Sequence, residues 1–252
     1  MKKLVLFCAL LLGTLLSTHH AQAQSLCAGG CVQYNSNEVF SGSSVAASLP
    51  TVTAGNGIHA MACFFTATSI TSADLNGTAA TVSTNLASNP GNYSCATIAA
   101  ANAAGGTNTL TVNFAGTCGD CFVYMEEWHG DASSTTLDAS NGTYTIGADS
   151  SSIPCGSITT TNANDVLEAF AFIPGNVAPT VLAGYAFAVT TGAVPGPYYS
   201  AYDSVAATGT YNPGFTSGPM SADNYVVCGA FKQSGSPPPA GHILNQLMLH
   251  AS

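Results

Sequence analysis

The sequence contains no arginine, and its lysines are limited to Lys2, Lys3 and Lys232. Twelve aspartates and glutamates leave a formal net charge of −9 at pH 7. A chain with so few cations cannot neutralise the phosphates of a nucleic acid or attract anionic lipid head groups. We therefore expect no nucleic-acid partner and no binding to acidic membrane surfaces. Salt bridges can contribute little to the stability of such a fold.

Long apolar segments are also scarce, and the longest begins almost at the first residue. Lys2 and Lys3 precede the apolar run Leu4 to Leu16, and Ala21-Gln22-Ala23 places small residues at a cleavage position. Spanning a bilayer takes roughly 20 apolar residues, so this run is too short to do so comfortably. We predict that residues 1–23 are a bacterial Sec-type signal peptide. Its removal would leave a secreted, extracellular or cell-surface protein without a membrane anchor.

Cysteine, in contrast, is abundant. Cys8 lies in the predicted signal peptide, and an even number of cysteines follows it, which indicates disulfides in an oxidising compartment. Each disulfide would contribute roughly 2–4 kcal/mol, in place of the missing salt bridges. The spacing leaves the pairing open. The candidate disulfide cysteines are Cys27, Cys31, Cys63, Cys95, Cys118, Cys121, Cys155 and Cys228.

Helical spacing is missing from almost the whole sequence, and strand patterns replace it. Residues 108–114, "NTLTVNF", alternate between apolar and polar side chains, as a half-buried strand does. Asn76-Gly77 separates two extended runs and predicts a hairpin with a type I′ turn. The Ala-rich run 95–106, "CATIAAANAAGG", could form a helical turn, but it ends in Gly-Gly and follows a strand pattern. We therefore interpret it as a strand followed by a loop.

Many short strands at even spacing predict an all-β fold, a single antiparallel β-sandwich or jelly-roll-like domain stabilised by disulfides. We place this domain at residues 24–233. Residues 234–252 begin with "SGSPPPAG" and are interpreted as a Pro/Gly/Ser linker and a short C-terminal tail.

Five stretches resemble a recurrent secreted bacterial β-sandwich module that is found beside fibronectin-like and carbohydrate-binding domains and has no established activity. They are "SITSADLNGTAATV", "AAGGTNTLTVNF", "YMEEWHGDASSTTLD", "SITTTNANDVLEAFAF" and "GTYNPGFTSGPMSADNYVVCGAFK". The resemblance covers most of residues 55–232 and implies the sandwich fold without implying a reaction. His129 stands where that module usually has serine, and the cysteines here are unusually many.

The stretch 118–131, "CGDCFVYMEEWHGD", gathers the most reactive side chains. A jelly-roll glycoside hydrolase would need two carboxyl groups on either side of one glycosidic bond. Glu126 and Glu127 are adjacent on a strand and point to opposite faces, so they cannot form that pair by themselves. Glu168 would complete a pair only if its strand lies alongside. The alternative is that these glutamates accept structural hydrogen bonds.

Cys118-Gly119-Asp120-Cys121 has the spacing of a redox motif, but that motif works at the start of a helix, whereas a strand pattern follows here. We favour a local disulfide across a turn, or two separate links to neighbouring strands. His59 and His129 would add ligands to a zinc site, although exported thiols are expected to oxidise instead.

Two binding sites remain open from the sequence. Asp131, Asp138 and Asn141 offer hard oxygen donors, so a structural calcium ion is the one cofactor suggested, against the simpler reading of a solvated loop. Tyr198, Ser200 and Tyr202 share one strand face and, with Trp128, would stack on a sugar if exposed, or pack in the core if not.

These observations favour a secreted, non-catalytic extracellular module with a structural, adhesive or glycan-binding role. Its expected partners are a polysaccharide or copies of itself, in which case it would self-assemble. The alternative is a jelly-roll glycoside hydrolase that uses paired carboxylates.

Overall fold

The computed structural model describes residues 30–66, 69–89, 92–132, 136–145, 152–173, 179–190, 198–216 and 223–234, and every regular element among them is a β-strand. All strand pairs are antiparallel. This confirms the all-β, antiparallel, disulfide-stabilised sandwich. The predicted signal peptide and, apart from Ser234, the predicted linker and tail lie outside the described residues.

Two large sheets form the middle of the molecule. The first inner sheet has the order β1 (Cys31–Val39), β10 (Asp120–Trp128), β3 (Gly57–Phe65), β8 (Tyr93–Ala100) and β6 (Thr81–Val82), and β7 (Ala87–Ser88) also pairs with β8. The second inner sheet has the order β11 (Leu137–Thr145), β20 (Asn224–Lys232), β14 (Asp165–Phe172), β17 (Tyr198–Val205) and β16 (Ala186–Thr190).

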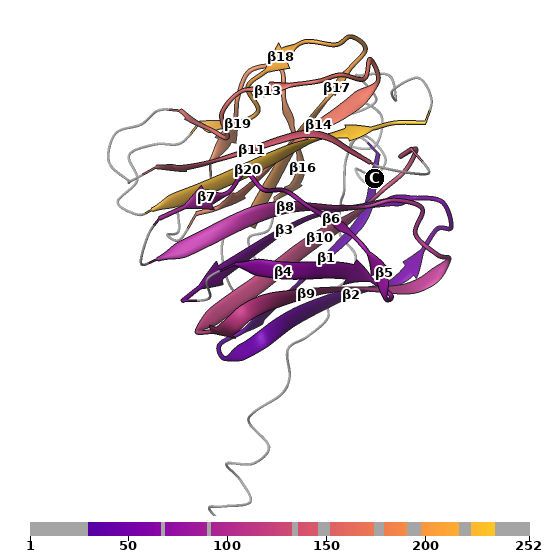
Figure 1. Cartoon of the computed structure of the whole chain (residues 1–252). Helices are drawn as coiled ribbons and strands as arrows, with labels where there is room; N and C mark the ends of the chain where they lie inside the picture. The colour runs from indigo at the N-terminus through magenta and orange to yellow at the C-terminus, as the bar shows by residue number, and fades with distance from the viewer. Residues whose placement is uncertain are drawn as a thin grey trace, which may run out of the picture.

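Smaller sheets cover the outer faces of this pair (Figure 1). The outer sheet, β2 (Gly42–Val52), β9 (Gly106–Cys118), β4 (Ile70–Leu75) and β5 (Thr78–Ala79), lies against the first inner sheet. The cap lies against the second inner sheet and comprises β12 (Ile153–Pro154), β19 (Gly214–Thr216), β15 (Thr180–Val181), β13 (Ile158–Thr159) and β18 (Thr210–Tyr211). The sandwich therefore has four layers.

Three apolar cores separate the four layers, so each inner sheet is buried on both faces. In β9, which has only one face against a core, buried and half-buried residues alternate from Asn108 to Phe114, as predicted from the sequence. In β14 every residue is buried. A strand covered on both sides needs apolar or paired side chains at every position, which explains why "DVLEAFAF" lacks alternation.

The Asn76-Gly77 hairpin has the predicted backbone. It joins β4 to β5, and both residues have positive φ angles, 52° for Asn76 and 81° for Gly77, as a type I′ turn requires. Asp74 reinforces the turn because its Oδ1 accepts a hydrogen bond from the Gly77 amide at 2.9 Å. The Ala-rich run also matches its prediction, since β8 ends at Ala100 and a loop follows.

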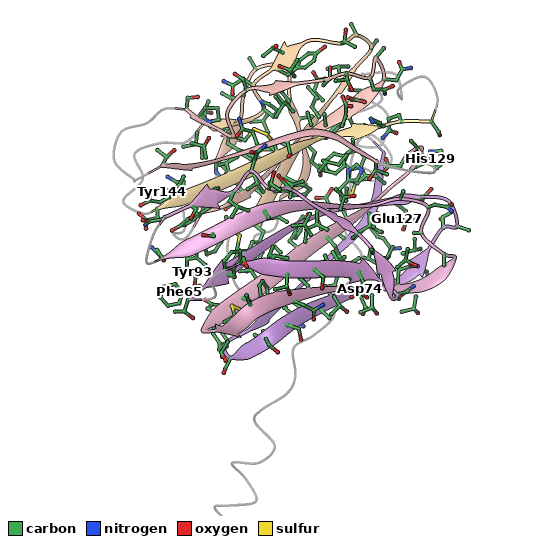
Figure 2. The ribbon with its side chains drawn as sticks, viewed as in Figure 1. Phe65, Asp74, Tyr93, Glu127, His129 and Tyr144 are labelled. Atoms are coloured by element: carbon green, nitrogen blue, oxygen red, sulfur yellow. A yellow bond between two sulfur atoms is a disulfide. The ribbon has the colours of Figure 1, made fainter. Side chains whose placement is uncertain are left out.

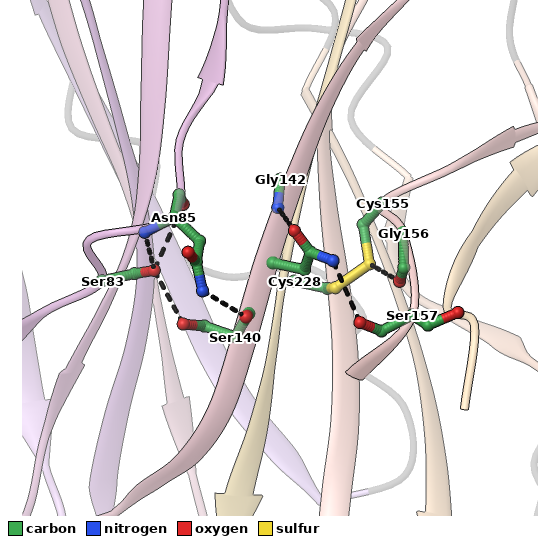
Figure 3. The surroundings of a disulfide bond; sticks show 9 residues. Ser83, Asn85, Ser140, Gly142, Cys155, Gly156, Ser157 and Cys228 are labelled. Atoms are coloured by element: carbon green, nitrogen blue, oxygen red, sulfur yellow. Dashed lines mark hydrogen bonds between the residues drawn. A yellow bond between two sulfur atoms is a disulfide. The ribbon is translucent and has the colours of Figure 1, made fainter. Parts of the chain in front are cut away.

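Three disulfides link described residues: Cys63–Cys95, Cys118–Cys121 and Cys155–Cys228. Cys31 is also disulfide-bonded, and Cys27 lies outside the described residues. The first joins directly paired positions of β3 and β8, and the third joins the cap to β20 (Figure 3). Cys118–Cys121 closes the turn between β9 and β10, so the structure shows the first of the two pairings left open for this spacing, the local disulfide. Such bonds indicate an oxidising environment.

Polar side chains connect neighbouring layers at their edges. Asn35 and Asn37 of β1 donate to the carbonyls of Ser48 and Ala46 in β2, at 2.6 and 2.7 Å. On another side, Asn85 donates to the Ser140 carbonyl of β11 at 2.8 Å (Figure 3). These bonds occupy backbone acceptors that an edge strand would otherwise present to another chain. Within the described residues, no helix is long and apolar enough to cross a membrane.

Candidate functional site

The two adjacent glutamates of β10 point to opposite faces of the first inner sheet, as expected from the alternation of a strand. Glu126 faces the second inner sheet, where it contacts Ser200. Glu127 faces the other way and contacts Thr53 and Asn56, which lie between β2 and β3. Both side chains are fully buried.

Glu127 is held by three hydrogen-bond donors from two parts of the chain (Figure 2 labels its position). Its Oε1 accepts from the Thr53 amide at 2.8 Å and from Asn56 Nδ2 at 2.6 Å, and its Oε2 accepts from Gln33 Nε2 at 2.6 Å. Three donors satisfy the hydrogen-bonding capacity of a side chain that has no access to water. Glu127 therefore anchors β1 and the segment before β3 to β10.

Glu126 makes a second carboxylate centre between the inner sheets. Its Oε2 accepts from the Trp128 indole Nε1 at 3.0 Å, and its Oε1 accepts from the hydroxyls of Tyr124 and Ser200. Ser200 belongs to β17 of the opposite sheet. A single carboxylate thus ties both inner sheets together through hydroxyl and indole donors.

The third glutamate, Glu168 of β14, reaches the same interior from the second inner sheet. Its Oε2 lies 2.8 Å from Nδ1 of His59 on β3, and His59 Nε2 lies 2.8 Å from Oδ2 of Asp131. Asp131 also accepts from Gln233 Nε2 at 2.7 Å. All of these side chains except that of Gln233, which is 8% exposed, are at most 3% exposed. We call Glu126, Glu168, His59 and Asp131 the interior polar cluster.

Two aromatic rings stack on the His59 imidazole. The Phe231 ring is stacked at a centroid distance of 3.5 Å, and the Trp128 ring is stacked at 5.3 Å. The carboxylates of Glu168 and Asp131 lie at the two nitrogens, and the whole residue is fully buried. The imidazole is therefore enclosed on every side that carries chemistry.

Each ring nitrogen of His59 faces a carboxylate oxygen, so a hydrogen must lie between each pair. This requires either an imidazolium between two carboxylates, or a neutral ring with one protonated carboxyl. Burial, and then the neighbouring carboxylate of Glu126, raise the pKa of Glu168 well above its ordinary value. The raised pKa favours the second arrangement, with a proton held on Glu168.

Two glycines make room for this cluster. A Cβ atom at Gly57 would lie 1.7 Å from Asp131 Oδ2, so only glycine lets that carboxyl approach His59. Gly229 pairs with Glu168 in the sheet, and a Cβ there would meet the Phe231 ring at 2.8 Å. These contacts explain why "NGIHA" and "CGAFK" place glycine inside or at the start of buried strands.

The condition for a carboxylate pair within one sheet, that the strand of Glu168 lies alongside β10, is not met. β14 lies in the opposite sheet, so Glu168 and Glu126 meet across the interior instead of side by side. Glu127 faces away from both of them. The side chains of Glu126, Glu127 and Glu168 are all fully buried.

Of the two alternatives left open for Tyr198, Ser200 and Tyr202, the structure shows packing in the core. β17 is flanked by β14 and β16, and its face carrying Tyr198, Ser200 and Tyr202 looks toward the first inner sheet. Tyr198 is 2% exposed, Ser200 is fully buried, and the half-buried Tyr202 packs edge-on against Trp128 at 5.5 Å. These rings fill the core because the second inner sheet is covered on both faces.

The three calcium candidates belong to separate hydrogen-bond networks. Asp131 contacts His59, Asp138 accepts from the Asn162 amide at 3.1 Å, and Asn141 donates to the Ser157 carbonyl at 3.0 Å. Within the described part of the chain, no group of three or more His, Cys, Asp and Glu side chains is placed to hold a metal ion. Asp131, Asp138 and Asn141 are therefore each bonded to different partners in the described residues. His129 is exposed (Figure 2) and takes no part in the His59 cluster.

A second acidic pair, Glu38 and Asp120, was not predicted from the sequence. Burial, and then the charge of Asp120 and a hydrogen bond with it, raise the pKa of Glu38 to about 7. The Tyr93 hydroxyl donates to Asp120 (Figure 2 labels Tyr93). Glu38 lies far from Asp120 in the sequence, and only the pairing of β1 with β10 brings them together. The strand patterns alone carried no signal for this contact.

No family model, curated protein or solved structure matches this chain.

We expect the protein to be more stable at pH 5 than at pH 7.5. Folding raises the pKa of Glu38 from 4.5 to about 7, that of Asp165 from 3.8 to about 6, and that of Glu168 well above 4.5. A carboxyl of this kind binds its proton more tightly when folded. Its stabilising contribution is fully present below the unfolded pKa and is lost as the pH rises through the folded pKa. Urea denaturation across this range measures the effect.

Glu38→Gln provides the matched control for that pH dependence. The variant cannot ionise at this position, so its midpoint should fall less between pH 5 and pH 7.5 than that of the wild type. Equal midpoints at both pH values for the wild type would contradict the prediction.

Proposed function

We propose that this protein is a secreted, non-catalytic structural module of the bacterial cell exterior. The observation that carries the proposal is the enclosure of its most reactive side chains. Glu126, Glu127, Glu168 and His59 are fully buried and bonded to partners from other strands. In this arrangement they connect layers of the sandwich. The disulfides, which indicate an oxidising environment, and the apolar run 4–16 support secretion.

The surface of the described residues favours a structural role over glycan binding. Its large exposed hydrophobic side chains are Val32, Phe40 and Leu86, and the single aromatic ring among them, that of Phe40, carries no hydroxyl or indole N–H to hydrogen-bond a sugar. A sugar-stacking site needs exposed rings, since stacking uses the ring face. The aromatic residues that the sequence suggested for this purpose fill the interior. Adhesion or assembly with copies of itself would use other surfaces.

One observation supports the alternative of a glycoside hydrolase. The fold brings Glu126 and Glu168 together from opposite sheets, and the two carboxyls differ in their surroundings. Acid–base hydrolysis of a glycosidic bond uses two carboxyl groups in different surroundings, one of which has a raised pKa as Glu168 has. The pair would need a path from the surface, because neither carboxyl has exposed area in this structure.

Sugar release from a panel of polysaccharides tests the proposal. We expect the purified exported protein to release no reducing sugar from any of them. Release that disappears in Glu126→Gln and in Glu168→Gln, while both variants keep the wild-type circular dichroism spectrum, would establish the hydrolase and overturn the structural role. His129→Ala, at an exposed position three residues after Glu126, is the control that should keep any activity.

A further inference from the structure

Lys232 is the only lysine after Lys3, and its position at the end of β20 gives it a single close carboxylate among the described ion pairs. Its Nζ lies 3.4 Å from Oδ1 of Asp138. The side chain of Lys232 is 32% exposed, whereas that of Asp138 is only 2% exposed. The amine thus approaches a nearly buried carboxyl from the solvent side.

Asp138 is presented to Lys232 by an irregularity of β11. The register of β11 against β20 shifts between Leu137 and Ala139, which leaves Asp138 as the extra residue of a β-bulge. A bulge turns its side chain away from the regular alternation of the strand. The carboxyl of Asp138 is therefore aimed at the end of β20 rather than into one face of the sheet.

Three donors hold the Asp138 carboxyl in place. Its Oδ2 accepts from the backbone amides of Thr161 and Asn162, the latter at 3.1 Å, and its Oδ1 accepts from the Thr161 hydroxyl. Two backbone amides that donate to one oxygen can stabilise the negative charge that develops on that oxygen in a tetrahedral intermediate. We call these two amides the cradle. The cradle lies in the 161–164 segment that precedes β14.

A second, fully buried carboxyl completes the arrangement. Asp165 pairs directly with Lys232 in the sheet, and its Oδ1 accepts from Asn162 Nδ2 at 2.8 Å. Its Oδ2 is buried and has no hydrogen-bond partner. Burial raises the pKa of Asp165 to about 6, against the lowering effect of Asn162 and with a further increase from the charge of Asp138. Asp165 is thus a carboxyl that can hold and release a proton near neutral pH.

We propose that Lys232 and Asp138 react to form an intramolecular isopeptide bond between β20 and β11, with Asp165 transferring the protons. Proximity of a nucleophile, an acceptor and an acid in a folded protein converts an unfavourable bimolecular condensation into a unimolecular one. Exclusion of water from the nearly buried Asp138 disfavours the reverse hydrolysis.

The reaction balances without any co-reactant. Although burial acts to raise it, the hydrogen bonds from Thr161 and Asn162 and the charge of Lys232 lower the pKa of Asp138. Asp165 therefore gives its proton to the Asp138 carboxylate only transiently, and it takes one from the Lys232 ammonium, which leaves a neutral amine beside a neutral acid. The Nζ lone pair then attacks Cγ of Asp138, and the Thr161 and Asn162 amides stabilise the oxyanion. Asp165 protonates the departing hydroxyl, water leaves, and the nitrogen returns its extra proton to Asp165. One C–N bond forms, one C–O bond breaks, and one water molecule is released.

Such a bond would act where the disulfides do not. Cys155–Cys228 joins β20 to the cap, whereas the isopeptide would join β20 to β11 within the second inner sheet. It would also survive reduction. Lys232, the one lysine after Lys3, would then serve as a covalent link rather than as a surface charge.

Trypsin provides a direct test, because the sequence has no arginine and Lys232 is its only cleavage site beyond the first three residues. We expect the full-length wild-type protein, once folded, then denatured and reduced, to resist cleavage after Lys232. Its intact mass should be lower than that of the fully reduced chain by one water molecule. Fragmentation should yield a branched peptide that joins residues around 138 to residues around 232.

Lys232→Arg is the matched control. It keeps the positive charge and the tryptic site but cannot form the amide, so it should be cut and should show no loss of water. Asp165→Asn should slow the loss of water in freshly refolded protein. Cleavage of the wild type after Lys232 together with an unchanged mass would overturn the proposal and leave an ordinary ion pair. Loss of water that persists in Lys232→Arg would overturn it as well.

Discussion

Replacing His59 with alanine should destabilise the protein by about 3–5 kcal/mol, because it removes a fully buried ring and leaves buried carboxyl groups without one of their hydrogen-bond partners. His59 is fully buried and lies 2.8 Å from both Glu168 and Asp131. Without the imidazole, two buried carboxyls lose one of their partners, and a cavity opens beside the rings of Trp128 and Phe231 that stack on His59. Urea denaturation of the variant and the wild type at the same pH measures the difference.

His129→Ala is the control for this substitution. His129 follows β10 directly and is exposed, so its removal should change the free energy of unfolding by less than about 0.5 kcal/mol. A His59→Ala variant that unfolds at the same urea concentration as His129→Ala would show that the interior polar cluster contributes little to stability. Glu168→Gln in the His59→Ala background should recover part of the loss, since it removes one of the unpaired carboxyls.

Removing the Cys155–Cys228 disulfide should have an effect of similar size. The two cysteines are 73 residues apart, and the chain-entropy estimate for a loop of that length is about 4 kcal/mol. Cys228 lies in β20 and Cys155 in the segment that follows β12, so the bond holds the cap on the second inner sheet. Denaturation of a Cys155→Ala/Cys228→Ala double variant, with the other disulfides intact, measures the loss.

The Cys118–Cys121 disulfide gives the matched comparison. Its cysteines are 3 residues apart, and the same estimate gives about 2 kcal/mol for so short a loop. A Cys118→Ala/Cys121→Ala double variant should therefore lose about half as much stability. The reverse order would mean that local packing around the CGDC turn, and not loop closure, sets the cost.

The local features of the fold were predictable because each depends on neighbouring residues. The positive φ angles of Asn76 and Gly77 follow from the intrinsic preference of that dipeptide. The alternation of residues 108–114 follows from one buried face, and the Cys118–Cys121 disulfide from two cysteines separated by a turn. The opposite directions of Glu126 and Glu127 follow from the period of a strand.

The contents of the site were not predictable for the same physical reason. Asp131 lies 72 residues from His59 in the sequence, and Glu168 lies 109 residues from it. Nothing in the local pattern of "GIHAMACFF" shows that a carboxyl will arrive at each nitrogen. The alternation of Tyr198 and Tyr202 along the strand is compatible with an exposed face and with a buried one. They lie in the interior because the first inner sheet packs against them.

The sequence by itself determined the all-β class, the disulfide chemistry and the strand faces, because backbone preference, cysteine number and side-chain period act over a few residues. The tertiary structure alone decided that the strands stack in four layers, that the glutamates are enclosed, and that Lys232 lies beside Asp138. Those outcomes depend on which sheet covers which face. That choice is made by the summed burial of apolar surface over the whole chain and not by any one segment.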